Sequence, residues 1–145
     1  MSGIIVGIDG SGHSRRALEW AVSEAAMRQV PLTVLTVYRA IVGYLGEPVQ
    51  YVGDAELTEQ ALKEAQRETD DVLAELAGSV PPSVTVRAVT GMPAAELLAS
   101  AEHADLLVVG ARGAGGFKRL LLGSVSTHVT HHAPCPVVVI PADKA

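Results

Sequence analysis

Glycines gather between residues 110 and 126 in a pattern that suits the binding of phosphate groups. A glycine leaves its backbone N–H uncovered and permits positive φ angles, and a helix N-terminus adds aligned donors with a partial positive charge. The stretch follows an apolar run typical of a buried strand, and a helix can begin at its end. Its spacing is G-x-x-G, nine residues, then G-S, formed by Gly110, Gly113, Gly123 and Ser124. We interpret it as a phosphate-binding loop.

A surface turn followed by a helix cap is the plainer explanation of any glycine-rich stretch. Loop length argues against it here, because strand-to-helix loops in α/β domains run about 2–6 residues and residues 110–122 make a connection about twice as long. The segment Phe117–Leu122 is too apolar for disorder. The loop is therefore expected to be packed and functional. Lys118 and Arg119 within it could reach phosphates or remain solvated.

The strands and helices that must position this loop alternate along the whole chain. The predicted strands are Gly3–Asp9, Leu32–Tyr38, Val84–Val89, Asp105–Val109 and Val137–Ile140. The predicted helices span residues 13–28, 54–77, 93–103 and 124–133, and Gly78 is expected to end the second of them. Uniformly apolar strands separated by helices indicate a parallel α/β sheet with helices on both faces and right-handed crossovers.

Asp9 is the second feature of the sequence, after the glycine loop, with a candidate chemical role. Two strand orders are plausible for five such units, and in either one ligands bind where the winding direction reverses. In the order 3-2-1-4-5 the reversal lies between the first and fourth strands, whose carboxyl ends are Asp9 and Gly110. Asp9 equally suits an Asx turn or a helix cap before Ser11 and Ser14. Its position opposite the glycine loop favours a nucleotide site, with the carboxylate on ribose hydroxyls or a metal.

The composition narrows the class of protein. The chain has 145 residues, 48% hydrophobic and 19% charged, so a single domain over residues 1–145 is expected. A net charge of -5 and a pI near 5.4 argue against nucleic acid or an anionic membrane as partner. No apolar run approaches the ~20 residues of a membrane span and no signal peptide is recognised, so a soluble cytoplasmic protein is predicted. The single cysteine, Cys135, is expected to be a packed side chain rather than a nucleophile.

Several motifs together resemble the universal stress protein family, and the resemblance covers nearly the whole chain. These are Gly7–Ser14, the Gly91–Pro93 turn, Asp105–Gly110, the G-x-x-G-x9-G-S loop and Ala133–Val139. In that family the complete glycine motif marks the ATP-binding branch. The resemblance implies a Rossmann-like sheet of order 3-2-1-4-5, a homodimer, and ATP bound with Mg²⁺ or Mn²⁺.

The resemblance also implies which residues meet the nucleotide. It places Ile8 and Asp9 at the nucleoside and the backbone around Val37 at adenine. It places Gly110, Arg112 and Gly113 along the ribose and phosphates. The terminal phosphates are assigned to Gly123, Ser124, Val125 and Ser126.

A regulatory stress-response protein, with ATP as a conformational ligand, is the function these inferences favour. Hydrolysis needs a base or water-positioning group beside the γ-phosphate, and no carboxylate or histidine lies inside the glycine motif. Enzyme activity is therefore left uncertain, at most a weak ATPase or an autokinase, and no catalytic residue is assigned. Binding of cyclic AMP stays open, because the same pocket could take a smaller adenine nucleotide. A dinucleotide oxidoreductase is disfavoured, because the second strand ends in Val37, Tyr38 and Arg39 rather than in an acidic residue.

Three histidines near the end of the last predicted helix invite a metal-binding interpretation. His128 and His132 form an i, i+4 pair, and His131 lies between them. No third ligand is evident, and a helix C-terminus favours imidazolium in any case. Solvated or capping histidines are therefore expected, and no metal ligand is assigned.

The strand Val137–Ile140 would form an edge of the predicted sheet. It is short, apolar and uncharged, with Pro136 and Pro141 at its ends. The unpaired N–H and C=O groups of such an edge invite another chain. Two-fold symmetry makes the pairing self-complementary, so a homodimer of two sheets joined by antiparallel strands is predicted.

The connection over residues 39–53 has no residue-level counterpart in the family to guide its interpretation. It contains Tyr44 and Tyr51. It is either a lid over the nucleotide or an apolar flap over the helix behind it, and the flap is favoured.

Overall fold

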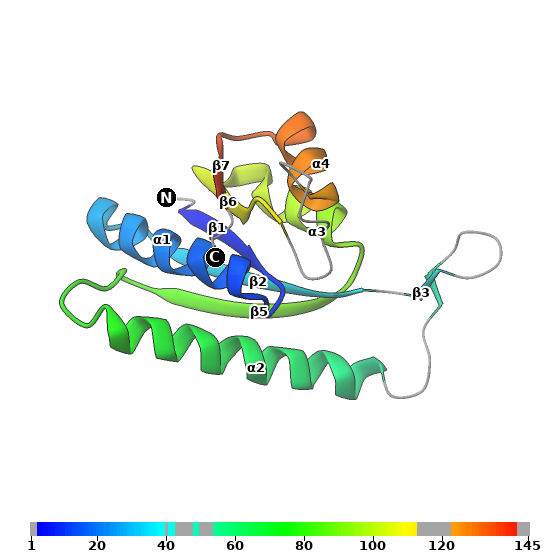
Figure 1. Ribbon diagram of the computed structural model, residues 1–145, viewed down its shortest axis with the longest axis horizontal. Coiled ribbons are helices and arrows are strands. Elements are labelled where there is room, and N and C mark those ends of the chain that lie inside the picture. The colour runs from blue at the N-terminus through cyan, green and yellow to red at the C-terminus, as the bar shows by residue number, and fades with distance from the viewer. Residues whose placement is uncertain (1–2, 40, 43–47, 50–53, 113–122, 142–145) are drawn as a thin grey trace.

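A five-stranded parallel sheet organises the chain, in the order β5-β2-β1-β6-β7 (Figure 1). The computed structural model describes residues 3–39, 41–42, 48–49, 54–112 and 123–141. The strands of the sheet are β1 (Ile4–Ile8), β2 (Leu32–Arg39), β5 (Val84–Gly91), β6 (Leu106–Gly110) and β7 (Val137–Ile140). All neighbouring strands pair in parallel. The predicted order 3-2-1-4-5 is thus confirmed.

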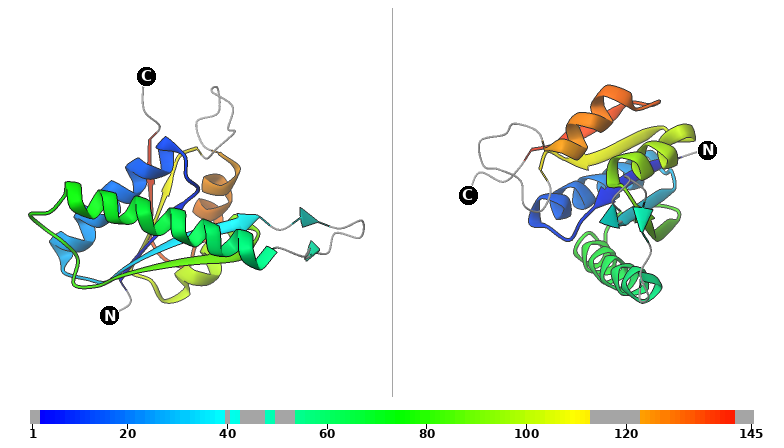
Figure 2. Two further views of the ribbon diagram at one scale, coloured as in Figure 1. Left: turned by 90° about the horizontal axis from the view of Figure 1, so that it is seen from below. Right: turned by 90° about the vertical axis from the view of Figure 1, so that its right-hand side faces the viewer.

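The helices cover both faces of this sheet. They are α1 (Gly12–Arg28), α2 (Asp54–Glu75), α3 (Pro93–Ser100), which runs into a 3-10 turn at Ala101–His103, and α4 (Ser124–His132). α1 and α2 lie on one face and α3 and α4 on the other (Figure 2). None of the helices in the described ranges is long and apolar enough to cross a membrane. Burial on both faces explains why the central strands β1 and β6 are apolar without alternation. The edge strand β5 departs from the expectation of uniformly apolar strands, because Thr85 and Arg87 alternate with its valines and are exposed.

The larger core lies between α1, α2 and the sheet. The predicted apolar face of α1 is completely buried there, with Ala17, Leu18, Ala21 and Ala25 each at 0% exposure. The smaller core lies under α3 and α4, where Leu97 and Val129 pack on Leu35 and Leu107. Ile4 and Val6 of β1 belong to the larger core and Ile5 to the smaller one, so β1 contributes side chains to both apolar layers.

Two local expectations are not met. Gly78 was expected to end α2, but the helix ends at Glu75 and Gly78 does not adopt a positive φ, which among the described residues occurs at Gly3, Gly10 and Gln29. The connection after β2 contains a small antiparallel pair, β3 (Ile41–Val42) and β4 (Pro48–Val49). Figure 1 places β3 beyond the carboxyl end of β2, and within the described elements β3 and β4 pack extensively only on each other. The flap expected over a helix is not seen in the described part of this connection.

Gly3 leads the chain into β1, and its replacement tests how tightly that entry is constrained. Its φ is +82°, and an added Cβ would lie 2.2 Å from the carbonyl oxygen of Pro31. We expect Gly3→Ala to lower the free energy of unfolding by about 2–4 kcal/mol, because left-handed strain and a backbone clash add. Gly12→Ala is the matched control, since no atom lies within 4 Å of its added Cβ. Urea unfolding should separate the two variants, and equal midpoints would contradict the argument.

Candidate functional site

Three of the predicted site residues lie at the carboxyl ends of the central strands of the sheet. β1 lies between β2 and β6, and the winding direction reverses between β1 and β6. Asp9 follows β1, Val37 lies near the end of β2, and Gly110 ends β6. In open α/β sheets ligands bind at the carboxyl ends of strands where the winding reverses. The strand order therefore brings these three positions together at the expected place.

The turn between β1 and α1 fixes Asp9 through a closed set of hydrogen bonds. The Oδ1 atom of Asp9 accepts a hydrogen bond from the backbone N–H of Ser11 at 2.9 Å, and Gly10 supplies a φ of +83°. Ser11 is the N-cap of α1, and its Oγ accepts from the N–H of Ser14 at 3.2 Å. The Oγ of Ser14 accepts in turn from the N–H of Asp9 at 3.1 Å. The Asx turn left open by the sequence is present, and it holds an exposed carboxylate at the end of β1.

Ala111 ties the end of β6 to the start of α4. The N–H of Gly123 donates to the carbonyl oxygen of Ala111 at 2.5 Å, and the N–H of Ala111 donates to that of Ile140 at 2.8 Å. The Oγ of Ser126 also donates to the Ala111 carbonyl, at 2.9 Å, and Ser126 is only 2% exposed. The hydroxyl of Ser126 therefore serves the fold, whereas Ser124 is exposed.

The N-terminus of α4 has no side-chain cap in the described part of the chain. Its N-cap is Gly123, and no acidic residue occupies its first turn. The first hydrogen bond within the helix runs from the N–H of Thr127 to the carbonyl of Gly123. The N–H groups of Ser124, Val125 and Ser126 precede that bond and belong to the donors that a helix leaves unsatisfied. Such a terminus suits an anion.

Gly110 and Arg112 add two features at the end of β6. A Cβ on Gly110 would lie 3.2 Å from the carbonyl oxygen of His13, so glycine permits the close approach of β6 to the first turn of α1. The Nε atom of Arg112 is buried and, within the described residues, has no hydrogen-bond partner. Leaving a buried donor unpaired costs about 1–3 kcal/mol. An anion at this place would remove that cost.

The other residues predicted to contact the nucleotide differ in which of their atoms a ligand could reach. The side chain of Ile8 is buried in the core under α1, and that of Val37 packs among the apolar residues under α3 and α4. These two residues can therefore meet a ligand chiefly through their backbone. Gly113, Lys118 and Arg119 lie outside the described residues.

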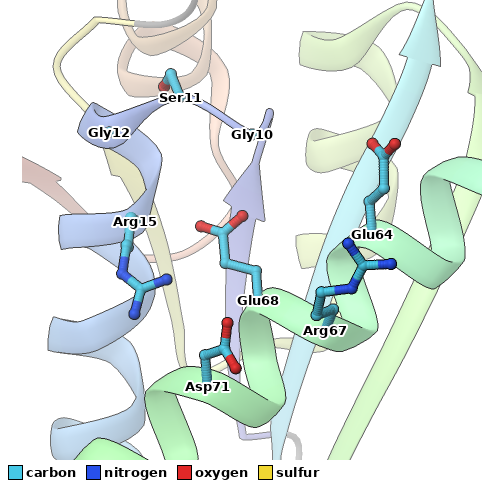
Figure 3. Close-up of a pocket in the computed structure, with 8 residues that line it drawn as sticks. All are labelled: Gly10, Ser11, Gly12, Arg15, Glu64, Arg67, Glu68 and Asp71. Atoms are coloured by element: carbon cyan, nitrogen blue, oxygen red, sulfur yellow. The ribbon is translucent and has the colours of Figure 1, made fainter.

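A polar cleft of about 240 Å³ lies between the β1–α1 turn and α2, and the sequence does not predict it (Figure 3). It is lined by Gly10, Ser11, Gly12, Arg15, Glu64, Arg67, Glu68 and Asp71. In Figure 3 the carboxylate of Glu68 points from α2 toward the turn. Glu64, Glu68 and Asp71 recur at helical spacing, which is a usable signal for one helix face. Only the strand order shows that this face lies against the turn that holds Asp9.

Glu68 is the electrostatically unusual group of this cleft. Burial raises the pKa of its carboxyl, and the negative charges of Asp9, Asp71 and Glu19 raise it further, against the opposing effect of Arg15. Its Oε1 atom is buried and finds no hydrogen-bond partner in the described residues. Arg15 is engaged elsewhere, at 2.8 Å from Glu75 and 3.4 Å from Glu19. Glu68 is therefore a poorly compensated carboxylate close to the candidate site.

Cys135 behaves as a packed side chain. It is half-buried and contacts the apolar cluster under α3 and α4. Burial raises the pKa of its thiol, which disfavours the reactive thiolate.

Comparisons of this chain with known proteins agree on one protein family. A sequence profile of the universal stress protein family matches residues 1–141. The chain is 37% identical over 140 residues to the "Universal stress protein in QAH/OAS sulfhydrylase 3'region" of Thermus aquaticus, covering 94% of this chain and 96% of that protein. It is 34% identical over 148 residues to a universal stress protein of Mycolicibacterium smegmatis, covering 97% of this chain but 48% of that protein. This chain thus spans about half the length of the mycobacterial relative.

A nucleotide complex is among the similar solved structures. It is a universal stress protein in complex with cAMP, 28% identical to this chain, with a TM-score of 0.67 over 96% of this chain and 95% of that one. The similarity therefore covers nearly the whole of both chains.

Glu68→Gln tests the cost of the buried carboxylate. A carboxyl whose pKa is raised on folding binds more protons in the folded state, so its contribution to stability is present at low pH and lost as the pH rises through the folded pKa. Relative to Glu68→Gln, the parent should therefore lose thermal stability from about pH 4.3, the usual value for glutamate, upward. The advantage of the variant in melting temperature should be larger at pH 7 than at pH 4.

Glu64→Gln is the control for this experiment. It removes an exposed carboxylate one turn earlier in the same cleft. Burial is the wrong explanation if the advantage of Glu68→Gln does not change with pH, or if Glu64→Gln shows an equal change.

Proposed function

The chain belongs to the universal stress protein family, and from that premise we propose that it binds ATP and acts as a nucleotide-dependent regulatory protein of the stress response. One juxtaposition carries the proposal. The exposed carboxylate of Asp9 follows β1, and the N-terminus of α4, which has no side-chain cap among the described residues, follows the neighbouring strand β6. A carboxylate suits ribose hydroxyls, and helix N–H donors suit phosphates. The cytoplasmic location stays a prediction from the sequence.

The phosphate side of the proposed site combines three kinds of donor. The N–H groups at the start of α4 supply a partial positive charge, Ser124 adds an exposed hydroxyl, and the buried Nε of Arg112 lacks a partner among the described residues. Charge-assisted hydrogen bonds from a guanidinium to phosphate are stronger than neutral ones. Gly113 would extend this set in the loop, as the sequence predicts. Such a supply of donors suits a triphosphate better than a single phosphate.

A divalent cation would fit this site as a companion of the triphosphate. Within the described ranges, no three His, Cys, Asp or Glu side chains come together in a way that could hold a metal. Mg²⁺ usually keeps several waters and binds through one or two carboxylates together with substrate phosphates. Asp9 could provide one such carboxylate, and the cation would neutralise phosphate charge.

Cyclic AMP is the second candidate ligand. The solved relative in complex with cAMP, 28% identical over nearly the whole chain, is the observation that favours it. A cyclic phosphate carries a single negative charge and would leave part of the proposed donor set unused. The two candidates therefore predict different dependence on Arg112.

Nucleotide titration by calorimetry tests both candidates. We expect Arg112→Gln to weaken ATP binding at least about tenfold, because a charge-assisted hydrogen bond is lost, and to leave adenosine binding nearly unchanged. Asp9→Asn should weaken the binding of both ATP and adenosine, because it removes the carboxylate that would accept hydrogen bonds from the ribose hydroxyls. Asp70→Asn, an exposed acid elsewhere on α2, is the control.

The ligand itself can be identified by mass spectrometry after denaturing freshly purified protein. Release of ATP or ADP supports the proposal, and release of cyclic AMP, with tighter binding of cyclic AMP than of ATP, would replace it. A folded parent that binds neither nucleotide would overturn it. Steady hydrolysis at the ~1–100 s⁻¹ of kinases would instead indicate an enzyme.

We also propose that the protein is a homodimer joined through β7, which forms one edge of the sheet. The carbonyl oxygens of Pro136 and Ile140 accept hydrogen bonds from the N–H groups of Leu107 and Ala111. Because strand residues alternate in direction, residues 136, 138 and 140 turn their backbone groups toward β6. Residues 137 and 139 turn theirs outward, to the open edge.

The outward groups are self-complementary. A two-fold axis at Val138 would place Val137 of one copy opposite Val139 of the other, with N–H and C=O groups exchanged on both sides. The side chains of these three residues are only partly buried. A second copy would complete both the hydrogen bonding and the burial of this strand.

Val139→Pro tests the interface without removing a bond to β6. Proline lacks the outward N–H, so the variant should shift toward monomer at micromolar concentration. Val139→Ala keeps that donor and should remain dimeric. Sedimentation equilibrium measures both, with circular dichroism to show that each variant is folded. A monomeric parent would refute the pairing. If Val139→Pro remains dimeric, the interface lies on another surface.

A further inference from the structure

The C-terminal half of α4 carries three exposed histidines, His128, His131 and His132. The ring centroids of His128 and His132 lie 4.7 Å apart, and the ring planes are tilted by 43°. Those of His131 and His132 lie 6.4 Å apart. The exposure of these side chains agrees with the expectation that they are solvated. The distance between the rings of His128 and His132, however, cannot be known from the sequence alone.

This spacing matches two imidazoles bound to one metal ion. A metal–nitrogen bond of about 2.0–2.1 Å places each ring centroid about 3.2 Å from the ion, and a ligand angle of about 90–109° then separates the centroids by about 4.5–5.2 Å. The distance between His128 and His132 falls inside this range. The distance between His131 and His132 falls outside it.

The position on the helix favours a cation as well. The i, i+4 spacing holds both rings on one face of a rigid element. The C-terminus of a helix carries a partial negative charge, and α4 ends at His132. No basic side chain other than the histidines lies in the last turn.

We propose that His128 and His132 chelate a divalent transition-metal ion that accepts imidazole ligands, such as Zn²⁺, Cu²⁺ or Ni²⁺. Within the described residues no third His, Cys, Asp or Glu side chain closes the site, so water fills the remaining positions and the ion is exchangeable. The chelate bridges the last turn of α4 and holds it helical. The site lies at the opposite end of α4 from the donors proposed to bind phosphate, and it does not rest on the proposed function.

Zn²⁺ titration of the full chain, without a histidine tag and without added nucleotide, tests the proposal. We expect one Zn²⁺ per chain in calorimetry, and the imidazole NMR signals of His128 and His132 should respond together. His128→Ala and His132→Ala should each weaken binding at least about tenfold, because the second ligand no longer binds at the high effective concentration set by the first. His131→Ala is the matched control and should change affinity less than about twofold.

Further controls separate this site from others. Asp9→Asn should leave Zn²⁺ binding unchanged, which distinguishes the histidine pair from any cation at the nucleotide site. Zn²⁺ should raise the melting temperature of the parent but not that of His128→Ala, because a ligand that binds the folded state stabilises it. Absence of stoichiometric binding by the parent would overturn the proposal. So would an equal loss of affinity in His131→Ala and His128→Ala.

Discussion

The central position of β1 is the constraint on which the rest of this structure depends. β1 is paired on both sides, with β2 and β6, and its side chains enter the apolar layers on both faces of the sheet. The chain can leave a strand enclosed in this way only at the end of the strand. The turn that follows must therefore lie next to the ends of the two neighbouring strands. Asp9 occupies that turn. The location of the candidate site is therefore a consequence of how the core is buried.

Polar groups at the carboxyl ends of β1 and β6 are of two kinds. Some form hydrogen bonds within the fold, and others lack a partner among the described residues. The Oδ1 of Asp9 and the hydroxyls of Ser14 and Ser126 are engaged by the backbone. The N-terminus of α4 and the Nε of Arg112 have no such partner in the described part of the chain. Buried donors without a partner are few in native proteins, and a bound ion is one explanation of them. The contrast separates scaffolding residues from those proposed to meet the ligand.

The cleft beside α2 connects the acidic face of that helix to the same turn. The charge of Asp9 raises the pKa of Glu68, so the two carboxylates repel each other across the cleft. By linkage, any cation that reduces the charge at Asp9 also eases the ionisation of Glu68. A cation bound at the end of β1 would thus be felt on α2 through charge alone.

Local patterns in the sequence predict the strands and the helices, because the signals for these act over short distances along the chain. Apolar runs, helical spacing and turn residues act within a few positions of the chain, and the motifs predicted the family that the comparisons confirm. The sequence left two strand orders open and described Asp9 equally well as an Asx turn. It did not predict β3 and β4, whose two-residue strands carry no period, and it misplaced the end of α2 at Gly78.

Tertiary structure alone decided which of these pieces meet. Parallel pairing brought β1 beside β6, about a hundred residues later in the chain, and this set Asp9 near Gly110. Packing of α2 against the first turn placed Glu68 beside Asp9, and burial turned the hydroxyl of Ser126 to the backbone of Ala111. These contacts depend on side-chain direction and burial across distant segments. No pattern within one segment encodes them, because each partner contributes only half of the interaction.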